Sequence, residues 1–279
     1  MAQAISNAFV QLFDAEVKQA YQASRQLVGL VRERTVEGSS VKFPKIGKGS
    51  ATLRVPQTDI TPMNISYSQV TCTLQDWNAA EYSDVFHQAK VNFDERRELV
   101  QVVSAAVGRR MDQLVIGALA GSASSLTVSN DIGGTDTGLN VAKLRRAKAL
   151  LDKQNVPMDG RVMLIHANSL ESLLGETAVI SADFNSVRAL VSGEINTFLG
   201  FKFVTIGDRT EGGLAIDGSL DRVVYAFHKD AVGLGVGMAM RSEINYVAEK
   251  TSYLVNGMFS AGAINIDDEG ICLITTRET

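Results

Sequence analysis

The sequence has few of the residues that mark secreted, metal-binding or cofactor-binding proteins. Its 279 residues include only 4 prolines, 6% aromatic residues and two cysteines, Cys72 and Cys272. These cysteines are far apart, and no Cys/His group has the spacing of zinc ligands. We therefore expect buried free thiols in a reducing compartment, with no metal site and no cofactor.

Neither an excess of charge nor a long hydrophobic run is present. The net charge is −4, from 27 basic and 31 acidic residues, which argues against a dedicated nucleic-acid-binding protein but allows a surface that lies beside DNA. No run reaches the ~18 apolar residues that a membrane span needs. The first residues also lack the layout of a signal peptide, so we expect a cytosolic protein without a membrane partner.

Catalytic motifs are missing as well. The histidines His87, His166 and His228 are scattered, and no nucleophile elbow accompanies the His166–Ser169 neighbourhood. The acidic run 267–269 is typical of a solvated turn, since one short run supplies too few cation ligands. These absences predict no catalytic residue, and an α/β enzyme without a short motif stays an alternative.

One long helix dominates what is present. Residues 92–121 form the longest uninterrupted helical pattern, with Asn92 and Glu95 placed as a capping box and Gly121 as a stop. Such a helix would be about 42 Å long, which suits a structural spine. Its apolar face is predicted to contain Leu99, Val103, Val107, Met111, Leu114 and Ala118.

The N-terminal segment, residues 1–35, is predicted to be an amphipathic helical arm. Phe9, Phe13, Val17, Ala20, Leu27 and Val31 fall close to helical spacing among charged residues. The cover for this apolar stripe is either the arm's own domain or a neighbouring subunit.

Residues 36–80 have the period-two pattern of strands and predict a long β-hairpin. Residues 41–43, 51–55 and 70–74 alternate in polarity, and Pro56 and Pro62 bracket a polar bend. The outgoing limb carries four basic residues, Lys42, Lys45, Lys48 and Arg54. Because the limbs have too little apolar surface to stand alone, the hairpin either lies on its own domain or, as we favour, reaches another chain.

An α/β block and a strand-rich end follow. Asn140 caps a predicted helix to Lys153, Asn168 a second helix to Gly175, and strands are expected at 161–165, 202–206 and 221–227. Residues 231–279 are expected to supply further strands. The GLGVG run at 233–237 lacks dinucleotide-binding spacing and predicts a closely packed strand.

This order of elements resembles the major capsid proteins of tailed double-stranded DNA bacteriophages, whose Hong Kong phage capsid fold is shared with encapsulins. The local resemblance lies in four segments: AEYSDVFHQAKVNFDERREL, MDQLVIGALAG, NVPMDGRVMLIHANSLESLL and INTFLGFKFV. It implies an α+β fold with an N-terminal arm (1–35), an extended hairpin or E-loop (36–80), a P-domain with a spine helix (81–138 and 231–279) and an α/β A-domain (139–230).

The resemblance also implies a function. The chain would assemble into hexamers and pentamers of an icosahedral virion shell around double-stranded DNA. Its contacts to neighbouring subunits would include Phe9, Phe13, Lys42, Lys45, Lys48 and Arg54. The alternatives are an encapsulin-type compartment shell and the α/β enzyme.

Two departures from the family pattern shape the expected partners. Many relatives carry a cleaved N-terminal scaffolding segment, whereas this arm begins almost at Met1. Either the chain is the mature form, or the scaffolding protein is a separate chain. A portal is a further expected partner. Some relatives cross-link through Lys–Asn bonds. The hairpin lysines and Asn256 do not match that motif, so we expect non-covalent assembly.

Overall fold

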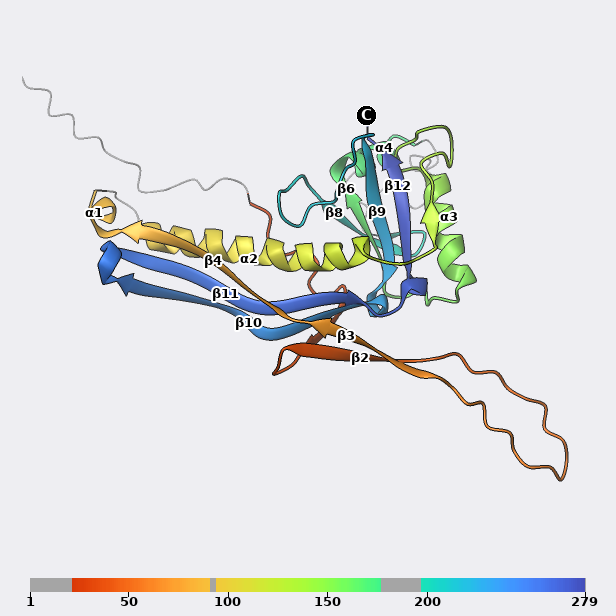
Figure 1. Ribbon diagram of the computed structural model, residues 1–279. Helices are drawn as coiled ribbons and strands as arrows, with labels where there is room; N and C mark the ends of the chain where they lie inside the picture. The colour runs from red at the N-terminus through yellow and green to blue at the C-terminus, as the bar shows by residue number, and fades with distance from the viewer. Residues whose placement is uncertain (1–21, 91–93, 177–196, 279) are drawn as a thin grey trace, which may run out of the picture.

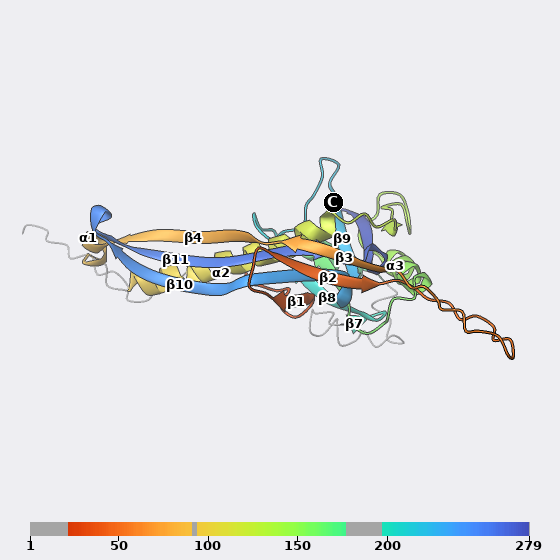
Figure 2. The same ribbon diagram turned by 60° about the horizontal axis from the view of Figure 1, so that its bottom comes forward.

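The computed structural model describes residues 22–90, 94–176 and 197–278. A long helix over a long sheet forms an extended part, and a second sheet with two helices forms a compact part at one end (Figure 1). A thin two-stranded hairpin extends beyond the compact part, as both views show (Figure 2). The described helices are α1 (Val85–Gln88), α2 (Glu95–Ala120), α3 (Val141–Lys153) and α4 (Ala167–Leu174).

The strands form three sheets. The four-stranded sheet has the order β1-β10-β11-β4, from β1 (Arg32–Thr35), β10 (Val232–Val247), β11 (Ser252–Asn265) and β4 (Gln75–Asp84). The six-stranded sheet has the order β5-β12-β9-β6-β8-β7, from β5 (Thr127–Val128), β12 (Ile271–Arg277), β9 (Asp221–His228), β6 (Arg161–His166), β8 (Phe201–Ile206) and β7 (Thr197–Phe198). The hairpin pairs β2 (Ser40–Ile46) with β3 (Tyr67–Thr73).

Helix α2 is the predicted spine, but its start differs from the prediction. The N-cap is Asp94, in an extended conformation and without a side-chain capping bond, and Asn92 lies outside the described residues. Glu95 makes no capping box, because its carboxylate accepts a hydrogen bond from the Ser83 hydroxyl at 2.7 Å. Gly121 is the C-cap, as predicted.

The buried residues of α2 do not form one stripe, because the helix packs against two different sheets. Val107 and Met111 pack with Phe259 of the four-stranded sheet, whereas Ile116 and Leu119 pack in the core beneath the six-stranded sheet. Leu99, Leu114 and Ala118, predicted on the buried face, are only partly buried. A helix that passes from one sheet to another buries more than one face, so a single stripe does not describe it.

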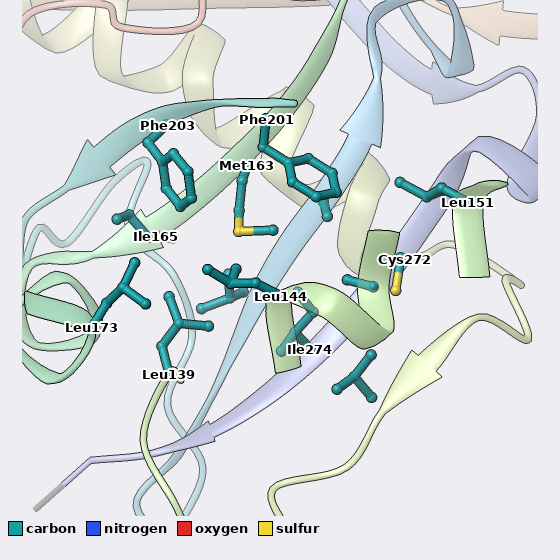
Figure 3. Close-up of a cluster of buried hydrophobic side chains, with 14 of the residues drawn as sticks. Leu139, Leu144, Leu151, Met163, Ile165, Leu173, Phe201, Phe203, Cys272 and Ile274 are labelled. Atoms are coloured by element: carbon teal, nitrogen blue, oxygen red, sulfur yellow. The ribbon is translucent and has the colours of Figure 1, made fainter. Parts of the chain in front are cut away.

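The compact part matches its predicted elements closely. Asn140 accepts a hydrogen bond from the Lys143 N–H and caps α3, which buries Leu144 and Leu151 against β6, β8 and β12 (Figure 3). Every residue of β6 is buried. Helix α4 ends at Gly175 as predicted, but His166 caps its start in place of Asn168.

The described end of the N-terminal arm is not helical. Residues 22–31 form no helix, and Arg32–Thr35 is strand β1, which pairs in parallel with β10. Leu27 and Val31 are buried in the same core as α2, so the subunit itself covers this part of the arm. A left-handed turn at Gly29 interrupts the predicted helix.

The hairpin is shorter at both ends than the pattern predicted. Gln75–Asp84 pairs with β11 in the four-stranded sheet and leaves the hairpin. The ladder of β2 and β3 ends with a hydrogen bond from the Gly47 N–H to the Ser66 carbonyl, and the predicted strand at 51–55 is not formed. Residues 47–66 contain no strand, although the two limbs lie close together: a Cβ added at Gly49 would be 3.1 Å from Met63. The prolines at 56 and 62 have no N–H to donate to a strand ladder.

Candidate assembly interface

The root of the hairpin is seated on its own chain. Val41, Phe43 and Cys72 are buried together with Ile266. The seat is a row of glycines in β10: a Cβ added at Gly233 would lie 2.7 Å from Phe43, and glycines at 235 and 237 lie equally close to other hairpin side chains. The GLGVG run therefore lets the hairpin side chains pack directly on the backbone of β10. Its composition predicted a closely packed strand but not that the hairpin is what packs on it.

The tip of the hairpin, residues 47–66, extends away from the rest of the subunit (Figure 1). Its apolar side chains are exposed, with Leu53 at 93% and Ile60 at 89% of their full area, and Val55 and Met63 above half. Several large apolar side chains exposed on one projecting segment are typical of a surface that another protein covers. The tip is the strongest candidate interface in the described part of the chain.

The four basic candidates fall into two groups. Lys45 and Lys48 form ion pairs within their own chain, to Asp267 at 2.8 Å and Glu269 at 2.5 Å. Lys42 and Arg54 are exposed, and Arg54 lies in the tip. Phe9 and Phe13 lie outside the described residues. For all six, a contact with a neighbouring subunit stays a prediction.

A buried carboxylate that the sequence did not indicate joins three segments. Asp112 of α2 is fully buried and accepts hydrogen bonds from the backbone N–H groups of Gln26 (2.9 Å) and Leu27 (3.1 Å). Its third partner is the Arg209 guanidinium at 3.5 Å. Burial raises the pKa of Asp112, and the backbone donors and Arg209 oppose that shift. The carboxylate thus holds the arm and the loop after β8 on the spine.

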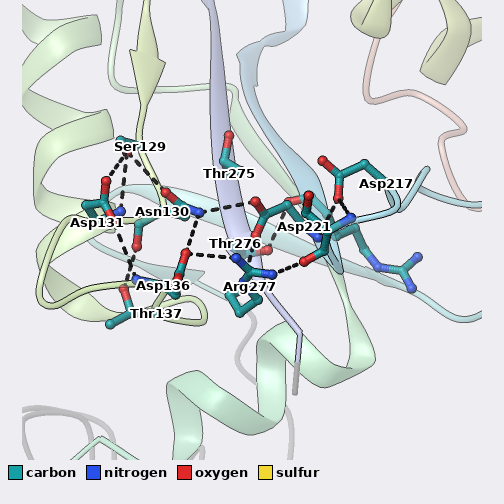
Figure 4. Close-up of polar contacts among 12 residues, drawn as sticks. Ser129, Asn130, Asp131, Asp136, Thr137, Asp217, Asp221, Thr275, Thr276 and Arg277 are labelled. Atoms are coloured by element: carbon teal, nitrogen blue, oxygen red, sulfur yellow. Dashed lines mark hydrogen bonds and ion pairs between the residues drawn. The ribbon is translucent and has the colours of Figure 1, made fainter.

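A polar network closes one end of the six-stranded sheet (Figure 4). Arg277 of β12 binds Asp136 at 2.8 Å and Asp221 at 3.2 Å, and Asn130 donates to both of these carboxylates. Nearby, the buried Lys143 ammonium donates to two backbone carbonyls, and burial lowers its pKa to about 8. The network ties the loops at 129–137 and 217–221 to the end of the sheet.

The residues considered for catalysis do not form a catalytic group. His166 is buried between Glu278 and Asp208, 3.0 and 3.1 Å from its ring nitrogens, and the buried Ser169 hydroxyl makes no hydrogen bond to it. Within residues 22–90, 94–176 and 197–278, no three His, Cys, Asp or Glu side chains are grouped to hold a metal ion. Among the helices of these same ranges, none has the length and apolar character of a membrane span.

The comparisons with known proteins agree over nearly the whole chain. The match to the solved capsid structure of the cyanophage P-SCSP1u covers 100% of this chain and 96% of the cyanophage chain, with a TM-score of 0.77 and 18% identity. The head structure of the Helicobacter pylori bacteriophage KHP40 has a TM-score of 0.79 at 10% identity over 99% and 98% of the two chains. The Mycobacterium phage Che8 structure has a TM-score of 0.74 at 17% identity over 96% and 98%.

These likenesses confirm the predicted α+β phage capsid fold, with its spine helix and extended hairpin. Among curated proteins none matches the sequence. A family model described as phage capsid protein matches residues 5–278. The chain belongs to the phage capsid protein family.

Proposed function

We propose that this chain is the major capsid subunit whose copies form hexamers and pentamers of an icosahedral shell around a double-stranded DNA genome. Membership of the capsid family and the phage heads among its structural neighbours support a structural role in a virion. A separate scaffolding protein and a portal belong to the same proposal. The shell wall encloses DNA without gripping it, which suits a chain with a net charge of −4.

The exposed hairpin tip carries this proposal. Its root is fixed on the subunit by buried Val41 and Phe43, but Leu53 and Ile60 at the tip have no apolar partner of their own. A limb with a buried root and an uncovered apolar end is suited to contact another copy of this chain. Identical heterologous contacts repeated around a ring close into hexamers or pentamers.

Deletion of the tip tests the proposal. We expect a variant in which Asn-Gly replaces Gly47 to Ser66 to fold, because the buried root is untouched, but to form no shells or capsomers. Light scattering and negative-stain images measure assembly, and circular dichroism measures folding. Tip-deleted protein that still builds shells would refute the assignment.

A full-length variant, Leu53→Ser with Ile60→Ser, is the matched control for chain length. It keeps both limbs and removes only apolar surface, so it is expected to assemble at least tenfold more slowly than the wild type. Native particles also distinguish a genome shell from a compartment for protein cargo, since only the former contains nuclease-protected DNA.

A further inference from the structure

The two sheets are joined where two tight turns meet. Turn η3 (Asp268–Gly270) leads from β11 of the four-stranded sheet to β12 of the six-stranded sheet, and η1 (Lys229–Ala231) leads back from β9 to β10. The backbone N–H groups of Ile266 and Asp267 both donate to the Ala231 carbonyl, at 2.8 and 3.2 Å. Both crossings between the sheets are therefore fastened to each other at this point.

The acidic run Asp267–Asp268–Glu269 lies at this junction, and each carboxylate engages a different residue. Asp267 binds Lys45 at 2.8 Å and Glu269 binds Lys48 at 2.5 Å, both on the outgoing limb of the hairpin. Asp268 accepts a hydrogen bond from the hydroxyl of Ser122, which follows the end of the spine helix, at 2.8 Å. One turn thus holds the hairpin, the spine and both sheets.

The two ion pairs are placed to set the direction of the hairpin. The buried root ends at Phe43, and Lys48 lies five residues farther out, about 16 Å along an extended limb. A single buried root would act as a pivot, whereas a second attachment beyond it fixes the angle. The hydrogen bond and the charge of Glu269 raise the pKa of Lys48, so this lysine stays charged at neutral pH.

The Lys48–Glu269 pair is exposed and the Lys45–Asp267 pair is part-buried, so water and salt ions reach both pairs. The Lys48 side chain is 75% exposed and that of Glu269 47%. Solvent-accessible pairs are individually weak, and added salt weakens them further, because the screening length falls from about 8 Å at physiological salt to about 3 Å at 1 M. Weak pairs of this kind can hold a hairpin in a free subunit and still be displaced by a stronger contact at its tip.

We infer that Asp267 and Glu269 form a salt-releasable latch, which holds Lys45 and Lys48 and thereby sets the direction in which the hairpin tip meets a second copy of this chain. The second copy as partner rests on the proposed function; the latch itself is a property of the single subunit. Asp267 and Glu269 are positioning residues in this scheme, since they act through the hairpin.

The distance between hairpin and body in the free subunit tests the latch directly. Spin labels at Arg54→Cys in the tip and Lys153→Cys at the end of α3 report this distance by pulsed electron paramagnetic resonance, and the buried native thiols stay in place. We expect a narrow distance distribution in low salt. The width of the distribution should at least double in about 1 M salt. It should also double in low salt in the double variant Asp267→Asn, Glu269→Gln.

Charge exchange separates an electrostatic latch from a general structural role. Lys45→Asp with Lys48→Glu should broaden the distribution, and adding Asp267→Lys with Glu269→Lys should restore it. Lys42→Ala, an exposed lysine on the same strand, should leave it unchanged. An equally narrow distribution in the Asp267→Asn, Glu269→Gln variant would overturn the latch.

Assembly supplies the second readout and keeps the two proposals apart. Latch variants should assemble severalfold more slowly by light scattering, and the exchanged charges should recover the rate. A wild-type protein that forms no shells, with its distances responding as expected, would contradict the proposed function and leave the latch standing. Shells that form normally from a chain whose distances do not respond would contradict the latch alone.

Discussion

Asp112 and Lys143 are fully buried charged residues, and each makes hydrogen bonds to backbone groups of other segments. Asp112 accepts the N–H groups of Gln26 and Leu27, and Lys143 donates to the carbonyls of Thr137 and Thr275. Neither residue stands out in the sequence, because a helical pattern locates a charge on a face but not the loop that comes to it. At the residue scale, these contacts tie α2 and α3 to backbone groups outside their own elements.

Replacing Asp112 by alanine is expected to lower the free energy of unfolding by about 2–4 kcal/mol. The change leaves two buried N–H groups without acceptors and Arg209 without its carboxylate. Chemical denaturation measures the loss, and hydrogen exchange should show faster exchange at the Gln26 and Leu27 amides. Gln101→Ala, on the exposed side of α2, is the control and should stay within about 0.5 kcal/mol of the wild type.

Lys143 gives a pH dependence whose sign follows from its lowered pKa. Its folded-state pKa is about 8, against 10.5 when unfolded, so between these values the unfolded chain binds more protons and stability rises with pH. This contribution is fully present above about pH 10.5 and is lost as the pH falls through about 8. The neutral amine still has enough N–H donors for both carbonyls.

Lys143→Met removes the titrating group and keeps a similar volume. The free energy of unfolding of the wild type, relative to this variant, should rise by about 2–3 kcal/mol from pH 8 to pH 10.5. Denaturation at a series of pH values measures the difference. Parallel curves for the two proteins would contradict the assigned pKa.

Among the elements, α2 shows how one helix serves two different neighbours. Along its length it passes from the four-stranded sheet to the core of the compact part, and the arm crosses it at Gly108. A Cβ added at Gly108 would lie 3.1 Å from the Arg25 backbone nitrogen, whereas one at Gly117 would meet nothing within 4 Å. The two glycines of this helix are therefore there for different reasons.

These glycines make a matched pair of substitutions. Gly117→Ala should stabilise the subunit by about 0.5–1 kcal/mol, the usual gain in a helix interior. Gly108→Ala has the same intrinsic gain but pushes the arm away from α2, so we expect no net stabilisation. Thermal unfolding of both variants decides, and an equal gain at the two sites would show that the arm adapts without cost.

On the scale of the whole molecule, the subunit combines a well-packed body with an uncovered limb. The six-stranded sheet, α3 and α4 enclose a core of their own, while the tip between Gly47 and Ser66 stands in solvent (Figures 1 and 3). A protein that has evolved to remain a monomer rarely leaves such a limb uncovered. Assembly would complete what the single chain lacks.

Protease sensitivity at Arg54 should report that change. Trypsin is expected to cut free subunits after Arg54, because this residue lies in the exposed tip outside any strand. In assembled particles the same bond should be cut at least tenfold more slowly, since under the proposed function a neighbouring copy would cover it. Gel electrophoresis with mass spectrometry of the fragments measures the rate, and equal rates in free and assembled protein would place the tip outside the interface.

Elements with local sequence signals were predictable without coordinates. The helix 141–153 with its Asn140 cap, the buried strand from Arg161 and the spine to Gly121 all follow from periodicity and capping within a few residues. The order of these elements was enough to suggest the family.

The places where non-local partners meet could not be predicted from local patterns. Residues 32–35 have a helical pattern but become a strand, because β10 offers them an open edge. Three features depend on segments distant in sequence. The glycines of β10 pack against the hairpin, Asp112 binds the arm, and the run 267–269 binds the two hairpin lysines. Local patterns record which face is apolar, whereas the partner for that face is chosen by how the whole chain packs.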